Sequence, residues 1–366
     1  MPPSPDLNAP SPAPTSTSSA TTATAARDRP VALLLPGQGS QHPGMATGLY
    51  GHVPVFTAVM DEFFALLRQE GEELRRDWLS DSPRVSLDDA SRAQPLLFAV
   101  GYALGRTLLD HGVRPTVLLG HSVGELAAAA LAGVFDLADA AWLMSARSAA
   151  LADTRPGGML AVAARPEQLT ALLASGPGIG PDRPAIGALN APAQTVLSGL
   201  EPQLAQFEET LREAGLTARR VPALQAFHCP ALGKAADVFE AAFDAVSLKP
   251  PSVRIWSTRT ARPVRAREAT DGGFWAQQLV APVLFWPALD DLLRHGDFTL
   301  VETGPGQGLS TLARRHPQVR ARRSAVVPLL PPRAGADLPF FRTALASLPT
   351  PSASGRPDPV ARPVGT

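Results

Sequence analysis

The chain is short of three things on which whole classes of protein depend: cysteine, net charge and long apolar runs. Its 366 residues include one cysteine, which excludes an internal disulfide framework and a zinc site built on a CxxC pair. The formal charge is +0, from 33 basic and 33 acidic residues, so binding nucleic acid or an anionic membrane is not expected to be its main task. No apolar run reaches about 18 residues, and no transmembrane helix is expected.

Other features of the composition indicate a globular protein. Apolar residues make up 45% of the chain, which is ample material for a core, and the length suits two domains or one large domain. The near absence of cysteine fits a reducing compartment, and we expect a cytoplasmic protein. Lys234 and Lys249 are the only lysines, a bias that we attribute to coding composition and not to function.

Both ends of the chain have the composition of tails. Residues 1–29 are dominated by Pro, Ser, Thr and Ala, and such a stretch cannot bury enough apolar surface to offset its ordering entropy. It lacks an apolar core, so it is not a secretory signal; a transit peptide is the weaker alternative to a disordered tail. A second Pro-rich tail is expected over 349–366. The globular part is therefore predicted to span 30–348.

Short apolar runs alternate with helical patterns in the first half of the globular part. One run, 31–35, leads into a Gly-rich turn, and a second, 115–119, leads into Gly-His-Ser-Val-Gly. Strands that alternate with helices predict an α/β fold with a parallel sheet covered on both faces. The expected helices are 53–70, 95–110, 123–132 and 136–152.

The middle of the chain has a different pattern. Its elements follow the order βαββαβ, which is the ferredoxin-like arrangement. We therefore expect a small subdomain over 156–224, inserted into a large subdomain made of 30–155 and 225–348. The expected strands are 158–163, 185–190, 194–198 and 216–221, and the expected helices are 166–174 and 201–214.

Gly120-His121-Ser122-Val123-Gly124 matches the pattern G-x-S-x-G between a predicted strand and a predicted helix. The glycines permit a tight turn that pushes the serine hydroxyl out of the backbone. The amide of Val123, at the start of the helix, can stabilise an oxyanion. The alternative is an ordinary Gly-rich helix start.

A serine nucleophile needs a base, and the chain has seven histidines. His228 lies in an apolar stretch just past the inserted subdomain, where a base and an ordinary core histidine are equally good interpretations. His121 is expected to point away from the hydroxyl, and His295 and His316 are expected at the surface. Cys229 is interpreted as a small buried hydrophobic residue and not as a reactive thiol.

Arg147 lies on a predicted helix with few charges nearby. An arginine in such a setting is usually kept by an anionic partner, although a solvated arginine on a helix face is the common alternative.

Six motifs occur in order along the chain: Pro36-Gly37-Gln38-Gly39-Ser40-Gln41, Ala93-Gln94-Pro95, Gly120-His121-Ser122-Val123-Gly124-Glu125, Asn190-Ala191-Pro192, Phe227-His228 and Glu302-Thr303-Gly304-Pro305-Gly306. With these motifs the chain resembles malonyl-CoA:acyl-carrier-protein transacylases and the acyltransferase domains of polyketide synthases, over roughly 31–348. The resemblance implies a large α/β-hydrolase-like subdomain with a ferredoxin-like insert, and the βαββαβ order described above agrees with that insert.

The resemblance implies a role for each matching residue. Ser122 would be the acylated nucleophile and His228 its base, oriented by a backbone carbonyl and not by a carboxylate. The amides of Gln38 and Val123 would form the oxyanion hole, and Arg147 would hold the free carboxylate of a malonyl-type group. Residues implied to line the substrate site are Gln94, Asn190, Phe227 and His121.

The resemblance also implies a substrate. A buried arginine left unpaired costs on the order of 1–3 kcal/mol, so Arg147 favours a dicarboxylic acyl-CoA. Phe227 before the histidine resembles malonyl-selective members of the family, because the ring would fill the space that an α-methyl group needs. Two departures from the family pattern bear on the substrate. Residues 148–152 lack the polar and Met side chains common in the family, which would widen the pocket and leaves an unusual extender unit as an alternative to malonyl. Ala281 replaces a polar residue.

We therefore expect a ping-pong acyltransferase that moves a malonyl group from CoA to the phosphopantetheine of an acyl carrier protein, in fatty acid or polyketide biosynthesis. No bound cofactor and no metal are expected, and the protein is expected to act as a monomer and in trans. The main alternative is an editing hydrolase with the same serine and histidine. An ordinary esterase with His316 as its base and a carrier-binding scaffold with a vestigial site are the others.

Overall fold

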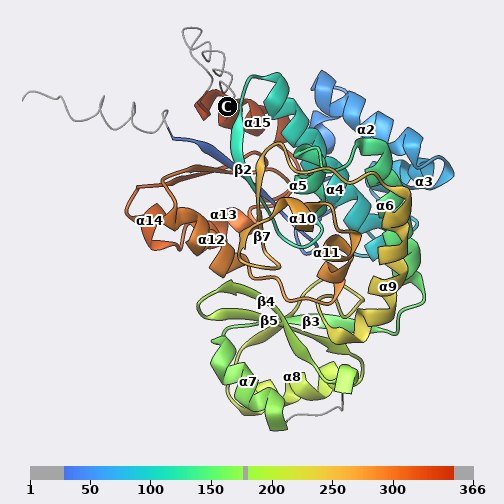
Figure 1. The fold of residues 1–366 in the computed structure, drawn as a ribbon, viewed down its shortest axis with the longest axis vertical. Coiled ribbons are helices and arrows are strands. Elements are labelled where there is room, and N and C mark those ends of the chain that lie inside the picture. The colour runs from blue at the N-terminus through green and yellow to red at the C-terminus, as the bar shows by residue number, and fades with distance from the viewer. Residues whose placement is uncertain (1–28, 176–179, 350–366) are drawn as a thin grey trace, which may run out of the picture.

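The computed structural model describes residues 29–175 and 180–349, and these form two β-sheets with helices around them (Figure 1). Of the expected tails, 1–29 and 349–366, all but residues 29 and 349 lie outside the described residues. A six-stranded sheet lies in the larger part of the molecule. A four-stranded sheet forms the smaller part, at the bottom of Figure 1. The α/β fold with a second, smaller sheet agrees with the prediction.

The large sheet has the strand order β10-β9-β1-β2-β7-β8. All neighbouring strands are parallel except β8, which pairs antiparallel with β7 at the edge. The central strand β1 is buried at every position because helices cover both faces, so its sequence is uniformly apolar and does not alternate. The strands are β1 (Val31–Leu35), β2 (Pro115–Gly120), β7 (Arg254–Ser257), β8 (Arg262–Pro263), β9 (Thr299–Glu302) and β10 (Ala325–Pro328).

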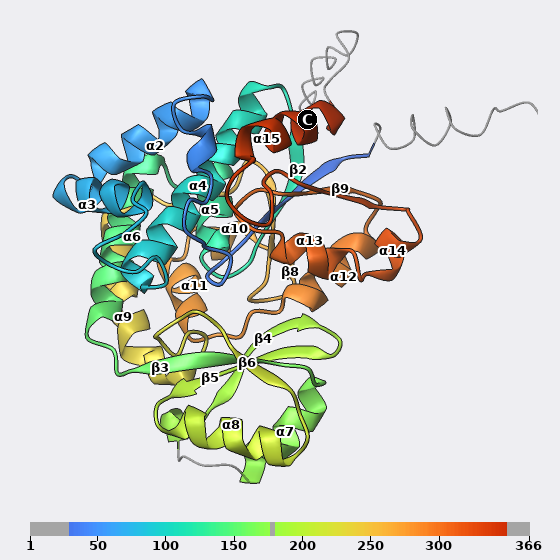
Figure 2. The same cartoon turned by 180° about the vertical axis from the view of Figure 1, so that it is seen from behind.

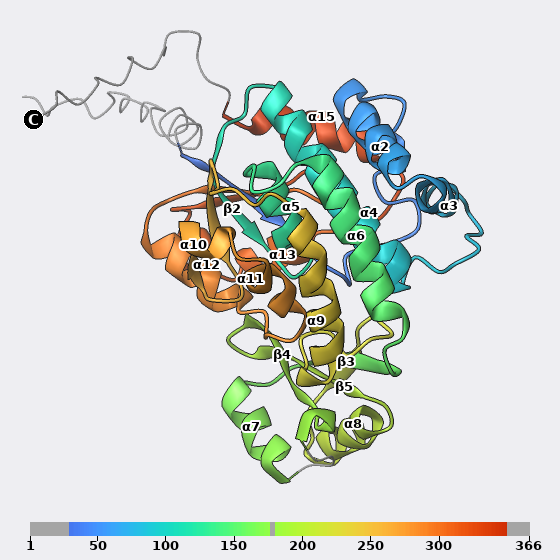
Figure 3. The ribbon, with the colours of Figure 1, turned by 45° about the vertical axis from the view of Figure 1, so that its right-hand side comes forward.

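Helices α4, α6 and α9 lie side by side on one flank, with α2 and α3 outside them (Figure 3). The helices of the first half of the large part are α2 (Pro54–Leu66), α3 (Gln69–Trp78), α4 (Ala90–Asp110), α5 (Gly124–Leu131) and α6 (Leu137–Ala152). Those of the second half are α9 (Gly233–Ala241), α10 (Ala266–Ala269), α11 (Gly272–Ala276), α12 (Phe285–Arg294), α13 (Gly308–Ala313), α14 (Pro317–Arg320) and α15 (Asp337–Ser347). The 3₁₀ turns are η1 (Thr47–Leu49), η2 (Gly180–Asp182), η3 (Pro230–Leu232), η4 (Ala242–Ala245) and η5 (Gln277–Leu279).

Two helix predictions were wrong at their boundaries. The expected helix 53–70 is two helices, because Arg68 takes a left-handed backbone with φ 56° that ends one helix before the next begins. The expected helix 95–110 begins at Ala90, because the side chain of Asp89 caps its N-terminus by accepting from the amide of Ser91. Pro95 therefore lies inside this helix and not at its start.

The small sheet has the order β4-β5-β3-β6 and is antiparallel throughout. Its strands are β3 (Gly157–Val162), β4 (Ala185–Ala191), β5 (Gln194–Leu200) and β6 (Ala218–Arg220), and its helices are α7 (Pro166–Ser175) and α8 (Gln203–Glu213). Both helices cover one face of the sheet (Figure 2), where Leu160, Leu197 and Phe207 share a separate core. The other face, carrying Met159, Ala161 and Val196, lines a cavity. The predicted βαββαβ order is confirmed.

Among the described residues, no helix has both the length and the apolar character needed to span a membrane.

Candidate active site

The turn between β2 and α5 presents the hydroxyl of Ser122. This residue has a left-handed backbone with φ 56°, which turns the chain sharply from the strand into the helix. The glycines on either side are required by close packing. A Cβ on Gly120 would lie 2.3 Å from the amide nitrogen of Glu125, and one on Gly124 would lie 2.1 Å from the carbonyl oxygen of Leu35. The local sequence therefore fixes both the turn and its contact with β1.

Ser122 and His228 form a hydrogen-bonded pair. The Oγ of Ser122 lies 2.8 Å from Nε2 of His228, although the two residues are 106 positions apart in the chain. The other ring nitrogen of His228, Nδ1, lies 2.9 Å from the backbone carbonyl oxygen of Ala281. The backbone amide of His228 also donates to the carbonyl of Leu279, at 2.8 Å. A base that is itself oriented by a third group is the arrangement that activates a serine hydroxyl.

The environment of His228 keeps its ring neutral. Burial, together with the nearby His121 and Arg147, lowers the pKa of His228 to about 3, although the hydrogen bond to the Ala281 carbonyl acts in the opposite direction. Within the described part of the chain, no carboxylate hydrogen-bonds to this ring. At neutral pH the imidazole is thus free to accept the proton of Ser122.

Two backbone amides, those of Gln38 and Val123, belong to the turns next to Ser122. Val123 is the N-cap residue of α5, and Gln38 follows β1, which runs beside β2. Across the described chain, neither amide donates to another backbone group outside regular helices and strands. Both strands carry their chains to the same edge of the parallel sheet, which brings the Gln38 turn against the elbow: a Cβ on Gly37 would touch the Cβ of Ser122 at 3.0 Å. This pair of amides can form an oxyanion hole.

Arg147, on α6, is 1% exposed. Its Nε donates to Oε1 of Gln94, and its guanidinium lies 5.4 Å from the centre of the Phe239 ring. Its two terminal nitrogens are buried without a hydrogen-bond partner. Burial lowers the pKa of Arg147 to about 9, which still leaves it charged at neutral pH. A buried cation with two free donors is a receptor for a planar anion such as a carboxylate.

A cavity of about 410 Å³ opens onto the Ser122–His228 pair. Its walls are the elbow, the open face of the small sheet and the region of α13. Of the residues predicted for the site, those lining it are Gln38, His121, Ser122, Asn190, Phe227 and His228. Arg147, Gln94 and Val123 do not line it. Because the terminal nitrogens of Arg147 are fully covered, an acyl group that reaches them must extend the cavity as it binds.

Gln94 connects the buried arginine to the cavity. It accepts from Arg147 and donates to Oε1 of Gln38 at 3.1 Å, and Gln38 in turn donates to the carbonyl of Asp88. On the cavity wall, Nε2 of His121 lies 2.9 Å from Oδ1 of Asn190. The expectation that this ring points away from the Ser122 hydroxyl stays a prediction.

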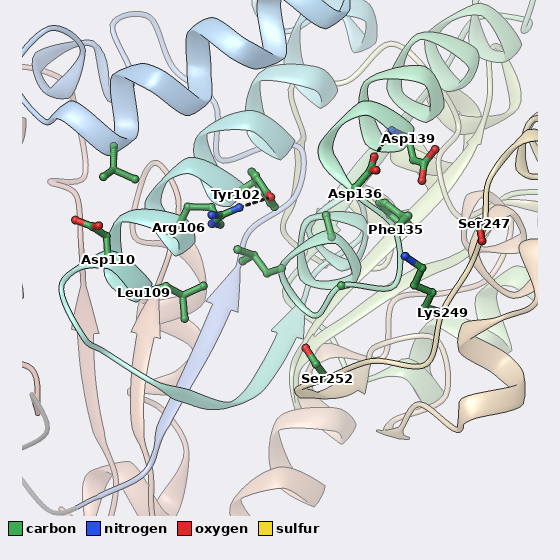
Figure 4. A pocket seen from close by; sticks show the side chains of 14 residues that line it. Tyr102, Arg106, Leu109, Asp110, Phe135, Asp136, Asp139, Ser247, Lys249 and Ser252 are labelled. Atoms are coloured by element: carbon green, nitrogen blue, oxygen red, sulfur yellow. Dashed lines mark hydrogen bonds between the residues drawn. The ribbon is translucent and has the colours of Figure 1, made fainter. Parts of the chain in front are cut away.

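A second cavity, of about 820 Å³, lies between the C-terminal ends of α4 and α5 and the start of α6 (Figure 4). It is lined by charges of both signs, among them Arg106, Asp136 and Lys249, and it contains neither Ser122 nor His228. Over the residues that the structure describes, no group of three or more His, Cys, Asp or Glu side chains is arranged to hold a metal ion.

The structure corrects one histidine prediction and confirms two other assignments. His316, expected at the surface, is 3% exposed. The reason is local: it caps α14 by accepting from the amide of Gln318, and its Nε2 lies 3.2 Å from Asp290. His295 is exposed and Cys229 is buried, as predicted.

Sequence reasoning missed three neighbours of the site, two of which come from distant elements. Phe239 contacts Arg147 from α9, and Gln278 and Glu125 lie behind the catalytic pair. Glu125 closes the elbow motif, Gly-His-Ser-Val-Gly-Glu, and its position there was the one signal available from the sequence.

The chain matches a family model and several curated proteins. Residues 33–353 match the family model described as "Acyl transferase domain". One component of the phenolphthiocerol/phthiocerol polyketide synthase of Mycobacterium tuberculosis is 37% identical over 289 residues, which cover 79% of this chain and 19% of that protein. The chain thus spans about a fifth or less of the length of the curated relatives it matches.

Two solved structures have the same fold. The acyltransferase domain from the second module of the salinomycin polyketide synthase superposes with a TM-score of 0.78 at 33% identity, covering 87% of this chain and 73% of that one. A malonyl CoA-acyl carrier protein transacylase from Coxiella burnetii superposes with a TM-score of 0.74 at 25% identity, covering 88% of this chain and 99% of that one.

Proposed function

The chain belongs to the acyl transferase domain family and is an acyltransferase; from this premise we propose that it moves a malonyl group from coenzyme A to the phosphopantetheine thiol of an acyl carrier protein. Three features of the site support this proposal. They are the activated serine, the two free backbone amides beside it and the unpaired guanidinium behind it.

The first half-reaction acylates the enzyme. Nε2 of His228 takes the proton of the Ser122 hydroxyl as Oγ attacks the thioester carbon. The negative charge that develops on the carbonyl oxygen is stabilised by the amides of Gln38 and Val123. When the C–S bond breaks, His228 returns its proton to the departing sulfur of CoA, and a malonyl ester remains on Ser122.

The second half-reaction reverses these roles. The phosphopantetheine thiol of the carrier protein gives its proton to His228 and attacks the ester carbon. The C–O bond to Ser122 breaks, and His228 returns the proton to Oγ. No step uses a resident cofactor or metal. Because burial keeps the ring of His228 neutral at rest, it is ready to accept a proton at the start of either half-reaction.

Our proposal that the acyl group is malonyl rests on one observation: the two terminal nitrogens of Arg147 are buried and have no hydrogen-bond partner. A malonyl carboxylate would accept from both in a bidentate pair, whereas an acetyl group would leave them unpaired. The cost of leaving such donors unpaired, about 1–3 kcal/mol or more, corresponds to roughly 10- to 200-fold in selectivity. The name of the Coxiella burnetii relative, a malonyl CoA-acyl carrier protein transacylase, supports the same substrate.

Within the dicarboxylic acyl groups, Phe227 favours malonyl over methylmalonyl. Its ring is 1% exposed, and it lines the cavity next to His228. An α-methyl group would compete with the ring for this space, a preference worth about 1–3 kcal/mol. Action in trans on a separate carrier protein, a monomeric state and a cytoplasmic location are parts of the same proposal.

The alternatives lack comparable support. The structure does not support an esterase with His316 as its base, because the His316 ring pairs with Asp290 and the Ser122 hydroxyl pairs with His228. An editing hydrolase would use the same catalytic pair, but the hydrolysis of mono-acyl chains gives no role to the free donors of Arg147.

The proposal is tested by mass spectrometry of the intact protein after brief incubation with malonyl-CoA, methylmalonyl-CoA and acetyl-CoA in competition. We expect a malonyl adduct that disappears when an acyl carrier protein is added. Ser122→Ala and His228→Ala should each abolish the adduct, because one removes the nucleophile and the other removes the base.

His316→Ala is the matched control and should keep the adduct. An adduct that persists in Ser122→Ala would overturn the proposed nucleophile. Release of free malonate without transfer to the carrier protein would show that water is the acceptor and would favour the hydrolase.

A further inference from the structure

Glu125 is a buried acid next to the site that the proposed reaction does not use. It is 1% exposed and lies in the first turn of α5, three residues after Ser122. Its backbone amide donates to the carbonyl oxygen of Ser122 at 2.8 Å. The backbone of Glu125 is therefore fixed to the residue that carries the nucleophile.

The side chain of Glu125 reaches away from α5 to two other elements. Its Oε1 accepts from the backbone amide and the hydroxyl of Thr258 and from the amide of Arg259, just after β7. Its Oε2 accepts from Nε2 of Gln278 in η5, and the hydroxyl of Ser257 lies 3.2 Å from both oxygens. A buried carboxylate with this many donors holds three elements in one arrangement.

The segment from Gln278 to Leu284 is the one that orients the base. The carbonyl of Leu279 accepts from the backbone amide of His228, and the carbonyl of Ala281 lies 2.9 Å from its Nδ1. The two carbonyls that hold His228, one at its backbone amide and one at its ring, thus come from a short stretch that begins in η5 and continues as irregular backbone. Such a stretch keeps its position only where other groups hold it.

Glu125 holds this segment at both ends. At its start the contact is direct, through the side chain of Gln278. At its end the contact passes through Thr258, whose carbonyl oxygen accepts from the amide of Leu284 at 2.6 Å. A space of only about 10 Å³ remains between Glu125, Gln278, Ser122 and His228, so the packing leaves little room for the parts to shift.

We propose that Glu125 is a positioning residue for the catalytic pair: its backbone fixes the elbow that carries Ser122, and its carboxylate fixes the segment that orients His228. One side chain thereby sets the distance between two residues that lie far apart in the sequence. A change of about 1 Å in such a distance can cost about 100-fold in rate. The role deepens the proposed acyl transfer and rests on it for the substrate, but the pairing of Ser122 with His228 can be measured without any acyl-CoA.

The test measures the rate at which a fluorophosphonate labels Ser122, because that reaction needs the activated serine and not the malonyl site. Glu125→Ala should slow labelling by about 10- to 100-fold, while the KM for malonyl-CoA changes little because Arg147 is untouched. Gln278→Ala, which removes one arm of the contact, should slow labelling to a smaller extent.

Rescue by the conservative variant separates positioning from a general loss of stability. In Glu125→Gln the new amide would face the amide of Gln278, but Oε1 of Gln278 is buried without a partner, so a flip of Gln278 restores the contact. We expect labelling within about threefold of the wild-type rate. Asp337→Ala, which removes a buried carboxylate on α15 that accepts from the amide of Gly48, is the matched control.

Wild-type labelling rates in both Glu125→Ala and Gln278→Ala would overturn the proposal. So would a loss of the same size in Asp337→Ala, because the effect would then be one of stability alone. If Glu125→Ala does not fold, as judged by circular dichroism, the Gln278→Ala rate decides. Failure of malonyl transfer with normal fluorophosphonate labelling would count against the proposed substrate and leave the positioning role intact.

Discussion

At the scale of single residues, Arg147 shows that a binding site can lower the stability of a protein as long as its ligand is not bound. Its terminal nitrogens are desolvated and unpartnered, an arrangement that burial alone makes unfavourable. Such a group is retained where a ligand supplies the missing partner. The charge of Arg147 also lowers the pKa of His228, so the anion that pairs with the arginine would act on the base as well.

Arg147→Ala should therefore change which acyl group the enzyme accepts. We expect kcat/KM for malonyl-CoA to fall roughly 10- to 200-fold, because the bidentate pair is lost, while the value for acetyl-CoA stays level or rises. Competition between the two thioesters, read by the mass of the acyl-enzyme, measures this ratio. Arg106→Ala, an exposed arginine at the second cavity (Figure 4), is the control and should keep the malonyl preference. An unchanged ratio in Arg147→Ala would mean that the carboxylate binds elsewhere.

Several of these residues could be predicted from the sequence, and others could not. Ser122 lies in a local motif, and the turn that exposes it needs only its neighbouring glycines. His228 and Arg147 each have an ordinary alternative on local grounds that is as good or better, because what defines them is burial and contacts from other elements. The surface position expected for His316 was wrong for the same reason: its arginine neighbours in sequence give no sign of the helix start that it caps.

At the scale of elements, the nucleophile turn is a contact between β2, α5 and β1. Its geometry depends on α5 approaching β1 so closely that only hydrogen fits at position 124. The sequence predicts this strand–turn–helix because both flanking elements are apolar and the glycines fall at the required spacing. It could not predict the segment that orients His228, because that segment is irregular and its function resides in backbone carbonyls, which leave no side-chain signature.

Gly124→Ala should disable the enzyme without touching a catalytic side chain. The added Cβ would meet two backbone oxygens, those of Leu35 at 2.1 Å and Pro36 at 2.9 Å, so α5 must move away from β1. We expect a stability loss of about 1–3 kcal/mol and a drop in Ser122 labelling of about 100-fold. Urea unfolding and fluorophosphonate labelling measure the two effects.

Gly233→Ala is the comparison for this variant. Position 233 begins α9 and has nothing within 4 Å of a Cβ, so alanine there should be neutral or slightly stabilising. If Gly124→Ala and Gly233→Ala had the same stability and the same rate of Ser122 labelling, the close contact between α5 and β1 would be contradicted.

At the scale of the whole molecule, two buried acids join separate elements of the fold. Glu125 joins α5 to β7 and η5, and Glu302 joins the end of β9 to the start of α13 by accepting from the amides of Leu309 and Ser310. Burial raises the pKa of each to about 7, against the hydrogen bonds that lower it. Sequence reasoning missed both, because a glutamate is ordinarily a surface residue.

These acids should make the fold less stable as the pH rises through the weakly acidic range. Between the ordinary glutamate pKa of 4.5 and the folded value of about 7, the unfolded chain has released the proton that the folded chain keeps. The free energy of unfolding therefore falls with rising pH across this window and levels off above it. Urea unfolding at about pH 5 and pH 8 measures the fall.

Glu302→Gln isolates one contribution, because glutamine does not titrate. Its free energy of unfolding should fall less between the two pH values than that of the wild type, whatever the absolute cost of the change. A fall equal to that of the wild type would show that Glu302 is ionised in the folded protein throughout. The charge of Arg314 also acts on this carboxylate, so the comparison is best made with that arginine intact.

The left-handed backbone of Ser122 also restricts which nucleophilic side chains can replace it. At φ 56° a side chain branched at Cβ is strained, whereas an unbranched one is tolerated. Threonine, the other hydroxyl nucleophile, is therefore disfavoured at this position by geometry and not by reactivity. Cysteine is unbranched at Cβ and fits the same turn. Replacing Ser122 with cysteine should therefore disturb the backbone less than replacing it with threonine. The backbone of this turn is therefore compatible with a cysteine nucleophile at position 122, next to the same base and oxyanion hole.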